Sequence, residues 1–314
     1  MSEERFVADI GGMRLDQFLA KRRPNYSRNH FKELVLRGCV RVDGVARPPD
    51  FRLAGGELIG LRWPESAWPA IPFEDLVLHE DKDILVIHKP AGLIAHPIAG
   101  SWLTEARAAL DDPEPSVVGL MLKHRPAVVA SGVSRCGLVH RLDRQTSGVL
   151  VLAKRPAAQE TLLEAFRERE VRKVYRAVVL GEFLKKLVDA PIGRRPGGRK
   201  VSVTPWGRES STAFSPLASA GGLSMIQAEP KTGRTHQIRA HLALIKHPVL
   251  GDFEWFLEPE KARLAALGLP PPPRMLLHAY RLRLAHPSSG KEVSFTARLP
   301  ADFREYWRLA EEKC

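Results

Sequence analysis

The sequence predicts an α+β protein with a small N-terminal helix-helix-strand module and a larger domain built on a mixed, mainly antiparallel sheet. Its length of 314 residues favours two domains, since one domain usually takes about 150 residues. A proline-rich stretch with little periodicity, residues 64–72, separates residues 1–63 from residues 73–314. In the larger part, short apolar runs outnumber helical patterns and follow no regular strand-helix-strand order, which favours α+β over α/β.

The N-terminal module carries two helix signals followed by strand signals. Residues 13–20 and 28–36 place apolar side chains at helical spacing. Ser27 can cap the second helix, and Gly38 can end it. Residues 40–44 predict a short strand that enters an Asp-Gly turn, and residues 53–61 predict a turn and a further strand.

The larger domain contains strand-like runs and two clear helices. Pro156 suits the first position of a helix, in which Leu162, Leu163 and Phe166 are expected to point inward. A second helix, over residues 235–246, has Ile238, Leu242 and Ile245 on one face. The predicted strands lie at 84–87, 149–152, 174–179 and 281–284, and the predicted loops at 111–116 and 267–273.

Charge is the most informative part of the composition. Lysine and arginine number 48 against 36 acidic residues, a net charge of +12, and the pI is about 9.9. This balance favours a polyanionic partner such as nucleic acid, although an arginine-rich, solvated surface would give the same value. Residues 14–47 hold nine basic residues against three acidic ones. Within that stretch we expect phosphate contacts from Arg14, Arg28, Lys32 and Arg37.

Several classes of protein are not expected. No run of about 18 apolar residues predicts a membrane-spanning helix, and the start of the chain lacks the pattern of a secretory signal. Cys39, Cys136 and Cys314 are far apart, without a Cys-x-x-Cys pair. The sequence therefore predicts a cytoplasmic protein in a reducing compartment, with no disulfide framework.

Familiar cofactor motifs are also absent. The sequence contains no G-x-x-x-x-G-K-[ST], no G-x-G-x-x-G after a strand, no G-x-S-x-G and no H-E-x-x-H. His236 and His241 share a predicted helix but point about 140° apart, which is poor geometry for one metal ion. We therefore expect neither a nucleotide cofactor nor a metal.

The densest polar segment is the loop from Gly137 to Gly148, which lies between two apolar strands. Asp143 sits there between Arg141 and Arg144. Neighbouring guanidinium groups favour an ionised carboxylate, which can act as a nucleophile or a base. An Asp-Arg pair that only ties down the loop would show the same pattern, so the residues alone leave both roles open.

Two sets of ordered motifs resemble known families. Arg14-Leu-Asp16, Ser27-Arg28, residues 34–38, residues 40–44 and residues 55–57 resemble the small RNA-binding module known from a ribosomal small-subunit protein, with Asp43 in place of the usual Asn. Residues 140–148, His-Arg-Leu-Asp-Arg-Gln-Thr-Ser-Gly, resemble the signature loop of the RluA-type pseudouridine synthases. The family's other motifs are resembled, in order, by residues 89–97, 173–179, 232–252 and 278–290. The variant at 96–100 is nearest to the D-type enzymes of large-subunit ribosomal RNA.

The resemblance implies an enzyme that isomerises uridine in structured RNA and acts without a cofactor. Asp143 is implied as the nucleophile or as the carboxylate that starts glycosidic cleavage. Arg239 is expected to hold Asp143 through a bidentate contact, with Arg234 as the alternative partner. Tyr175 is implied to offer an aromatic face for the uracil and a phenol for proton transfer.

Further positions are assigned on the same resemblance. Arg141 is placed to enter the space left by a flipped nucleotide, and Lys89 is a candidate phosphate contact or only a surface charge. His140 and Leu142 are expected to be scaffold. Residues 251–256 lack the family's Tyr-Gly, and residues 267–273 form an unusual proline-rich loop. Both departures are expected to leave the catalytic motifs untouched.

Two alternatives stay open at this point. One is a transfer RNA pseudouridine synthase, and the other is a catalytically inactive RNA-binding factor for ribosome assembly. Retention of Asp143, Tyr175 and Arg239 favours an active enzyme. We expect a monomer that has RNA, most simply ribosomal RNA, as its partner.

Overall fold

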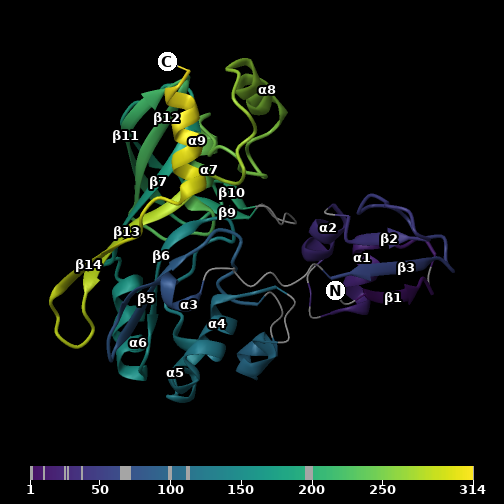
Figure 1. Cartoon of the computed structure of the whole chain (residues 1–314), viewed down its shortest axis with the longest axis horizontal. Coiled ribbons are helices and arrows are strands. Elements are labelled where there is room, and N and C mark those ends of the chain that lie inside the picture. The colour runs from purple at the N-terminus through teal and green to yellow at the C-terminus, as the bar shows by residue number, and fades with distance from the viewer. Residues whose placement is uncertain are drawn as a thin grey trace. The chain divides into compact units, whose positions relative to one another are not determined.

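The computed structural model describes residues 3–9, 11–24, 26, 28–36, 38–63, 72–97, 101–110, 114–194 and 201–313 (Figure 1). The chain divides into two compact units, one formed by Met1–Ile71 with Ile94–Ala127 and the other by Pro72–Leu93 with Val128–Cys314. The predicted division into residues 1–63, 64–72 and 73–314 stays a prediction. Most of the predicted linker lies outside the described residues.

The N-terminal residues form a three-stranded antiparallel sheet with two helices. The elements are β1 (Glu3–Val7), α1 (Leu15–Arg22), α2 (Arg28–Leu36), β2 (Val40–Val42) and β3 (Leu58–Arg62), and the strand order is β1-β3-β2. Leu15, Phe18 and Leu19 of α1 share one core with Phe31 and Leu34 of α2. The predicted helical faces are therefore confirmed, although α1 starts two residues later than expected.

The turns of this module follow from its glycines. Asp43 and Gly44 have φ values of 48° and 76°, and Val42 and Val45 exchange two backbone hydrogen bonds of 2.9 Å. This is the predicted Asp-Gly hairpin turn. Gly38, with a φ of 73°, ends α2 as expected. The predicted cap Ser27 lies outside the described residues. The sequence did not predict β1, a short strand with half-buried side chains only at alternate positions.

Residues Ile94–Ala127 contribute short helices to the same unit. These are η1 (Ser101–Leu103), η2 (Ala106–Ala109), α4 (Val117–His124) and the first part of α5 (Pro126–Ala130). The Ser116 hydroxyl caps α4 by accepting the Gly119 N–H at 3.0 Å. Of the loop predicted at 111–116, residues 111–113 lie outside the described residues and the rest is not helical.

The larger unit is built on a nine-stranded sheet in the order β4-β5-β6-β13-β7-β12-β11-β8, with β14 paired to β13. All neighbours are antiparallel except β6 and β13, which confirms the mixed, mainly antiparallel sheet. A separate ladder joins β9 and β10. The elements are α3 (Phe73–Leu76), β4 (Val77–Glu80), β5 (Ile84–Lys89), η3 (Ser134–Gly137), β6 (Ser147–Ala153), α6 (Pro156–Arg167), β7 (Arg172–Leu180), β8 (Lys186–Asp189), β9 (Ile192–Arg194), β10 (Val201–Val203), β11 (Ser211–Ala220), β12 (Leu223–Pro230), α7 (Gln237–Leu244), α8 (Glu258–Ala266), β13 (Leu277–Ala285), β14 (Glu292–Thr296) and α9 (Ala301–Glu311).

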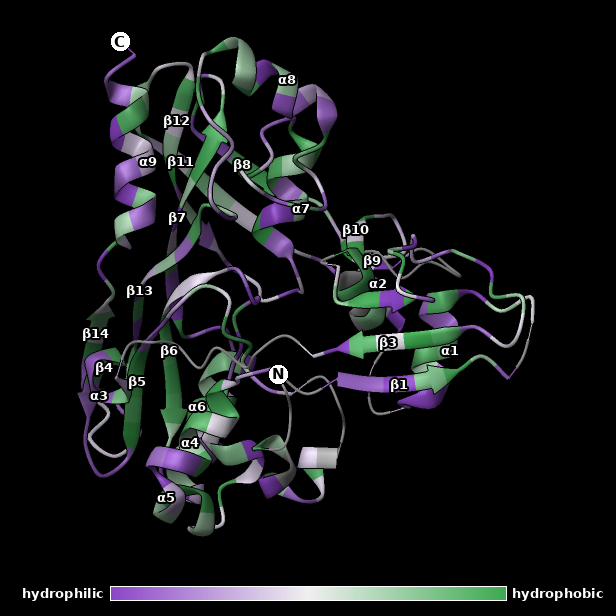
Figure 2. Cartoon of the chain, turned by 45° about the vertical axis from the view of Figure 1, so that its right-hand side comes forward, coloured by the Kyte–Doolittle hydropathy of each residue, from purple (hydrophilic) through white to green (hydrophobic). Residues whose placement is uncertain are grey.

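Helices cover the apolar stretches of this sheet. Val178 of β7 packs in one core with Phe303 and Trp307 of α9, whose alternating polar and apolar residues are visible in Figure 2. The next residue, Val179, packs in another core with Ile238 of α7. Because successive side chains of a strand point to opposite faces, α9 and α7 lie on opposite faces of β7.

The predicted helices of this unit are found, with one side chain misassigned. Pro156 starts α6, whose Leu162 is buried and whose Phe166 packs against the same core. Leu163 was predicted to point inward but is exposed, because the buried stripe of α6 is narrower than its apolar composition suggests. Residues 267–273 form the predicted loop after α8.

Candidate active site

The loop before β6 is fixed at both ends. Gly148 has a φ of 123°, and a Cβ atom there would lie 2.2 Å from the carbonyl oxygen of Ala279. Only glycine therefore lets β6 and β13 approach in parallel at this point. The His140 Nε2 accepts the N–H of Val151 at 3.0 Å, and its ring stacks on Phe166. Burial lowers the pKa of His140 to about 3, which keeps the imidazole neutral. Its position fits the predicted scaffold role.

Lys89 anchors the same loop through hydrogen bonds from its buried side chain. Its side chain is fully buried, and its Nζ donates to the carbonyl oxygens of Leu93 at 2.7 Å, Pro90 at 2.9 Å and Arg144 at 3.2 Å. Burial lowers the pKa of Lys89 to about 7, against the opposing effect of the nearby Asp143 charge. An ammonium whose three donors meet backbone carbonyls is not available to a phosphate. The predicted substrate contact and surface position of Lys89 are both wrong.

The structure brings Asp143 and Arg239 together. Arg239 Nη1 donates to Asp143 Oδ2 at 3.2 Å. The bidentate contact expected for this pair goes instead to Asp252, which accepts from Nε at 2.6 Å and from Nη2 at 2.8 Å. Arg239 and Asp252 are buried, whereas 22% of the Asp143 side chain is exposed. Arg239 is therefore fixed by two hydrogen bonds to the buried Asp252. It donates one further N–H to Asp143, whose carboxylate reaches solvent.

Helix α7 places Arg239 through a network around its first turn. Gln237 accepts from the Thr232 hydroxyl at 2.6 Å and donates to the carbonyl of Ser211 and the hydroxyl of Thr212. Burial by itself would lower the pKa of Arg239, but the hydrogen bond to Asp252 and the surrounding carboxylates raise it. The guanidinium therefore carries a permanent positive charge in the interior.

Tyr175 contributes an aromatic ring to the same unit. It lies on β7, paired with Ala228 of β12 and Ala279 of β13, and is half-buried. Burial and the negative charge of Asp143 raise the pKa of Tyr175 well above its usual value. Its side chain is therefore a neutral phenol at neutral pH. As a proton acceptor it must release its own proton in the same step.

Two further predicted arginines, Arg234 and Arg141, are more accessible than Arg239, and the predicted role of Arg141 stays a prediction. Arg234 is half-buried, and its Nε donates to the carbonyl oxygen of Glu209 at 3.2 Å. Its contacts do not include the Asp143 carboxylate, so the alternative pairing of Asp143 is not observed. Arg141 is exposed, two residues before Asp143, where its side chain is open to solvent.

The sequence did not predict that His236, Phe253, Glu254 and Trp255 surround the Asp143–Arg239 pair. His236 Nε2 lies 3.8 Å from Asp143 Oδ1, and its Nδ1 lies 3.6 Å from Glu254 Oε2. The guanidinium carbon of Arg239 lies 4.9 Å from the ring centre of Trp255 and 5.3 Å from that of Phe253. The departure at 251–256 therefore touches the catalytic motifs, contrary to our expectation.

The sequence signal that could have led to Asp252 is the Gly251-Asp252 pair at the end of the motif over residues 232–252. Gly251 has a φ of 74°, and a Cβ atom there would lie 2.2 Å from the Arg274 carbonyl oxygen, so the backbone before Asp252 requires glycine. A buried arginine also needs more acceptors than one half-exposed aspartate supplies.

Two family models match this chain. A family model described as RNA pseudouridylate synthase matches residues 83–244, more than half of the chain. The chain belongs to the RNA pseudouridylate synthase family. A model of the S4 domain also matches residues 13–59. The membership predicted from the motifs, the RNA-binding character of the N-terminal module and the enzyme class are thereby confirmed.

Relatives of this RNA pseudouridylate synthase match along almost the whole chain. Ribosomal large subunit pseudouridine synthase D of Yersinia pestis is 36% identical over 309 residues, covering 94% of this chain and 90% of the relative. An uncharacterized RNA pseudouridine synthase of Aquifex aeolicus is 35% identical, covering 95% and 94%. The structure of human RNA pseudouridylate synthase domain containing 4 has a TM-score of 0.55 at 28% identity, covering 75% of this chain and 94% of that chain.

The S4 region of the synthase presents its basic residues around one buried carboxylate. Arg14 and Arg28 both donate to Asp16, at 3.1 and 2.9 Å. Burial would raise the pKa of Asp16, but these two arginines lower it. Lys32 is exposed on α2, and Arg37 lies outside the described residues. Phosphate contacts from these positions stay a prediction.

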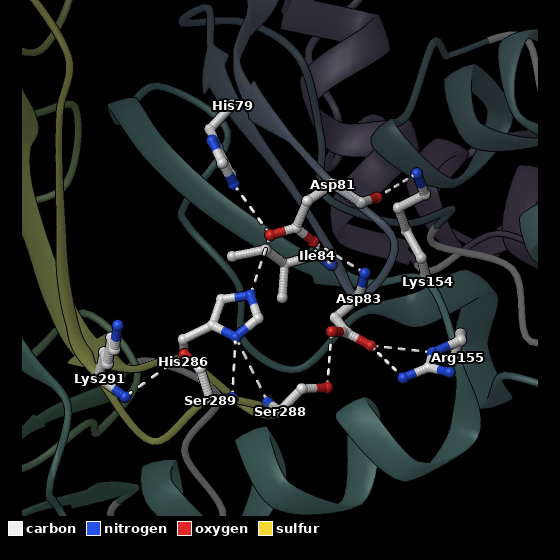
Figure 3. Close-up of polar contacts among 10 residues, drawn as sticks. All are labelled: His79, Asp81, Asp83, Ile84, Lys154, Arg155, His286, Ser288, Ser289 and Lys291. Carbon is white, nitrogen blue, oxygen red and sulfur yellow. Dashed lines mark hydrogen bonds and ion pairs between the residues drawn. The ribbon is translucent and has the colours of Figure 1, made fainter.

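A second carboxylate cluster joins two hairpins of the larger unit (Figure 3). Ligand atoms of Asp81, Asp83 and His286 lie within 4.8 Å of one another, a spacing that a cation could use. Asp81 already accepts from His79 and His286 and from two backbone N–H groups. Asp83 is paired with Arg155 and with the Ser288 hydroxyl. These partners account for the cluster as a link between the β4–β5 and β13–β14 turns.

Within the part of the chain that the structure describes, no helix combines the length and the apolar character needed to cross a bilayer.

Proposed function

We propose that this synthase converts uridine to pseudouridine in large-subunit ribosomal RNA, and that Asp143 starts the cleavage of the glycosidic bond. The names of the D-type relatives, at 36% identity over 94% of this chain, support the choice of RNA. The observation that carries the assignment of Asp143 is its place in the Asp252-Arg239-Asp143 cluster. Asp143 accepts a hydrogen bond from the buried Arg239 guanidinium and is 22% exposed. Asp252 is buried, and Glu254 lies 3.9 Å from Arg239 as an ion pair without a hydrogen bond between them.

The reaction is an isomerisation that needs no cofactor. The bond from uracil N1 to the sugar C1′ breaks, the uracil turns, and a bond from C5 to C1′ forms. C5 then loses its proton and N1 gains one, so atoms and electrons balance. Asp143 acts on the sugar and Arg239 holds its carboxylate, while Tyr175 offers its ring to the uracil and its phenol to the proton transfer. Arg141 occupies the gap left when the nucleotide leaves its stack.

Mapping of pseudouridine in a strain that lacks this protein tests the proposal. One or more pseudouridines should disappear from large-subunit ribosomal RNA and return when the wild-type protein is supplied. Asp143→Asn should not restore them, whereas Glu164→Gln, which changes an exposed carboxylate of α6, should. Loss from transfer RNA instead would reassign the substrate. An unchanged map would favour the inactive RNA-binding factor.

A further inference from the structure

The sheet of the larger unit carries arginines on the face opposite to Tyr175. Along β7, Tyr175 and Val179 belong to the core under α7, whereas Val178 and Leu180 belong to the core under α9. Arg172 and Arg176 lie an even number of residues from Val178, so their side chains are on the same face of the sheet as α9. They lie beyond the residues that α9 covers. Together with Tyr280, Arg281 and Arg283 of β13 they line a groove of about 280 Å³. We call these five residues the arginine groove.

The charges of this groove are not balanced by the protein. Within the described part of the chain, Glu229 is the only acidic residue in the lining, so four arginines face one carboxylate. Among the residues that the structure describes, Arg283 is the only groove arginine with an ion pair, 3.7 Å from Glu292. Arg172 stands directly opposite Arg283 in the β7–β13 register. Like charges in that position destabilise a sheet, so the fold tolerates a cost here.

Tyr280 organises the centre of the groove. The Arg176 guanidinium carbon lies 3.7 Å from the ring centre of Tyr280, and the Arg281 guanidinium lies 5.5 Å from it. The Nε of Arg176 is buried and has no hydrogen-bond partner in the described part of the chain. A guanidinium stacked on an aromatic ring is held flat, which leaves its remaining donors pre-oriented for a planar or tetrahedral oxyanion.

We propose that the arginine groove is a second RNA-binding site, which takes the phosphate backbone of the substrate RNA away from the modified uridine. The inference rests on the proposed function, because that function supplies a polyanion as the partner. Arg172 and Arg176 are separated by about 13 Å along the strand, at about 3.3 Å per residue. Several phosphates of one strand can meet such a row, whereas a single small anion engages only one or two of these arginines.

The main test compares two variants of equal charge. The groove variant is Arg172→Gln, Arg176→Gln and Arg281→Gln, which removes the three arginines without ion pairs. The control variant is Arg263→Gln, Arg304→Gln and Arg308→Gln, which removes three exposed helix arginines outside the groove. Both are made in the Asp143→Asn protein, so that binding is measured without turnover. The probes are polyuridylate and a structured transcript of large-subunit ribosomal RNA.

Affinity is measured against salt concentration for each probe. Each phosphate contact that is lost should lower the log-log slope by about 0.7 to 0.9, so the groove variant should lose about two units of slope. Its affinity should fall by about tenfold or more for each contact. The control variant should change both values much less. Equal behaviour of the two variants would overturn the proposal.

Two further measurements guard against a folding artefact and against another partner. The groove variant should melt close to the parent protein, because relief of the Arg172–Arg283 repulsion offsets the lost stacking of Arg176 and Arg281 on Tyr280. Tyr280→Phe should bind RNA like the parent, whereas Tyr280→Leu should bind several-fold more weakly because it loses the stacking platform. If the groove variant kept its affinity for RNA but lost affinity for polyglutamate, the groove would be a binding site for an acidic protein. That result would contradict the proposal. Polyuridylate binding does not depend on modification, so a failure here is distinct from a failure of the proposed function.

Discussion

Two carboxylate-arginine clusters have opposite patterns of burial, one in the S4 region (residues 13–59) and one in the larger unit, which holds Asp143 and is the catalytic unit. In the S4 region the carboxylate of Asp16 is buried, while Arg14 and Arg28 are 31% and 34% exposed. In the catalytic unit Arg239 is 2% exposed, and the Asp143 carboxylate faces outward. A buried anion that holds exposed cations suits binding of a polyanion. A buried cation that holds an exposed anion suits chemistry by that anion.

The largest effect should come from Arg239. Arg239→Gln leaves Asp252 buried without its bidentate partner, which should cost about 3 to 5 kcal/mol of the free energy of unfolding and abolish turnover. Arg234→Gln is the matched control, since among the described residues the Arg234 guanidinium donates to the Glu209 carbonyl and pairs with no carboxylate. Thermal melts and a tritium-release assay measure the two effects. A greater loss in Arg234→Gln would show that the two arginines have been assigned the wrong way round.

Tyr175→Phe should separate stacking from proton transfer. The variant keeps the aromatic face and loses the hydroxyl, so kcat should fall by about a hundredfold while RNA affinity stays near that of the parent. A single-turnover assay beside a binding titration gives both values. Turnover close to that of the parent would leave Tyr175 with the stacking role only.

Acid should affect the catalytic unit before the S4 region. Burial lowers the pKa of His140 to about 3 and that of His278 to about 4. Between the ordinary histidine pKa of about 6.5 and these values the unfolded chain binds protons that the folded chain does not. The free energy of unfolding should therefore fall as pH falls through this window, by about 1.4 kcal/mol per pH unit for each histidine.

Asp16 sets a lower pH window for the loss of stability in the S4 region. Its pKa is lowered by Arg14 and Arg28, so its contribution is present above the ordinary aspartate pKa and is lost only at lower pH. Hydrogen exchange measured by region from pH 7 to pH 4.5 compares the two units. His140→Asn, which can still accept a hydrogen bond but cannot titrate in this range, should flatten the profile of the catalytic unit. Parallel profiles of the two regions would argue against this difference.

The smallest effect is expected in the S4 region. Lys32 is exposed on α2, and Lys32→Gln should lower the log-log salt slope of RNA binding by about 0.7 to 0.9. Lys261→Gln, which changes an exposed lysine paired with Glu258 on α8, serves as control. An unchanged slope in Lys32→Gln would remove Lys32 from the RNA contacts.

Local sequence patterns predicted the elements whose structure is set by residues close together in the chain. Helix α2 spans the predicted residues because its apolar spacing and its terminal glycine are local signals, and the Asp143 loop is marked by charged residues between apolar strands. The clamp of Arg239 by Asp252 could not be found this way, because their side chains meet only after α7 and the following turn have packed. Lys89 was misplaced because a lysine is almost never fully buried unless its charge is paired or its donors are met.

Asp143→Asn tests the central claim most directly. The substitution is nearly isosteric and leaves Arg239 paired with Asp252, so the variant should stay folded and bind RNA with little change in affinity. Pseudouridine formation should fall below detection, because the carboxylate that acts on the sugar is gone. Asp16→Asn should show the reverse pattern, with a lower melting temperature and weaker RNA binding. A folded Asp143→Asn protein that still makes pseudouridine would contradict the account of the active site.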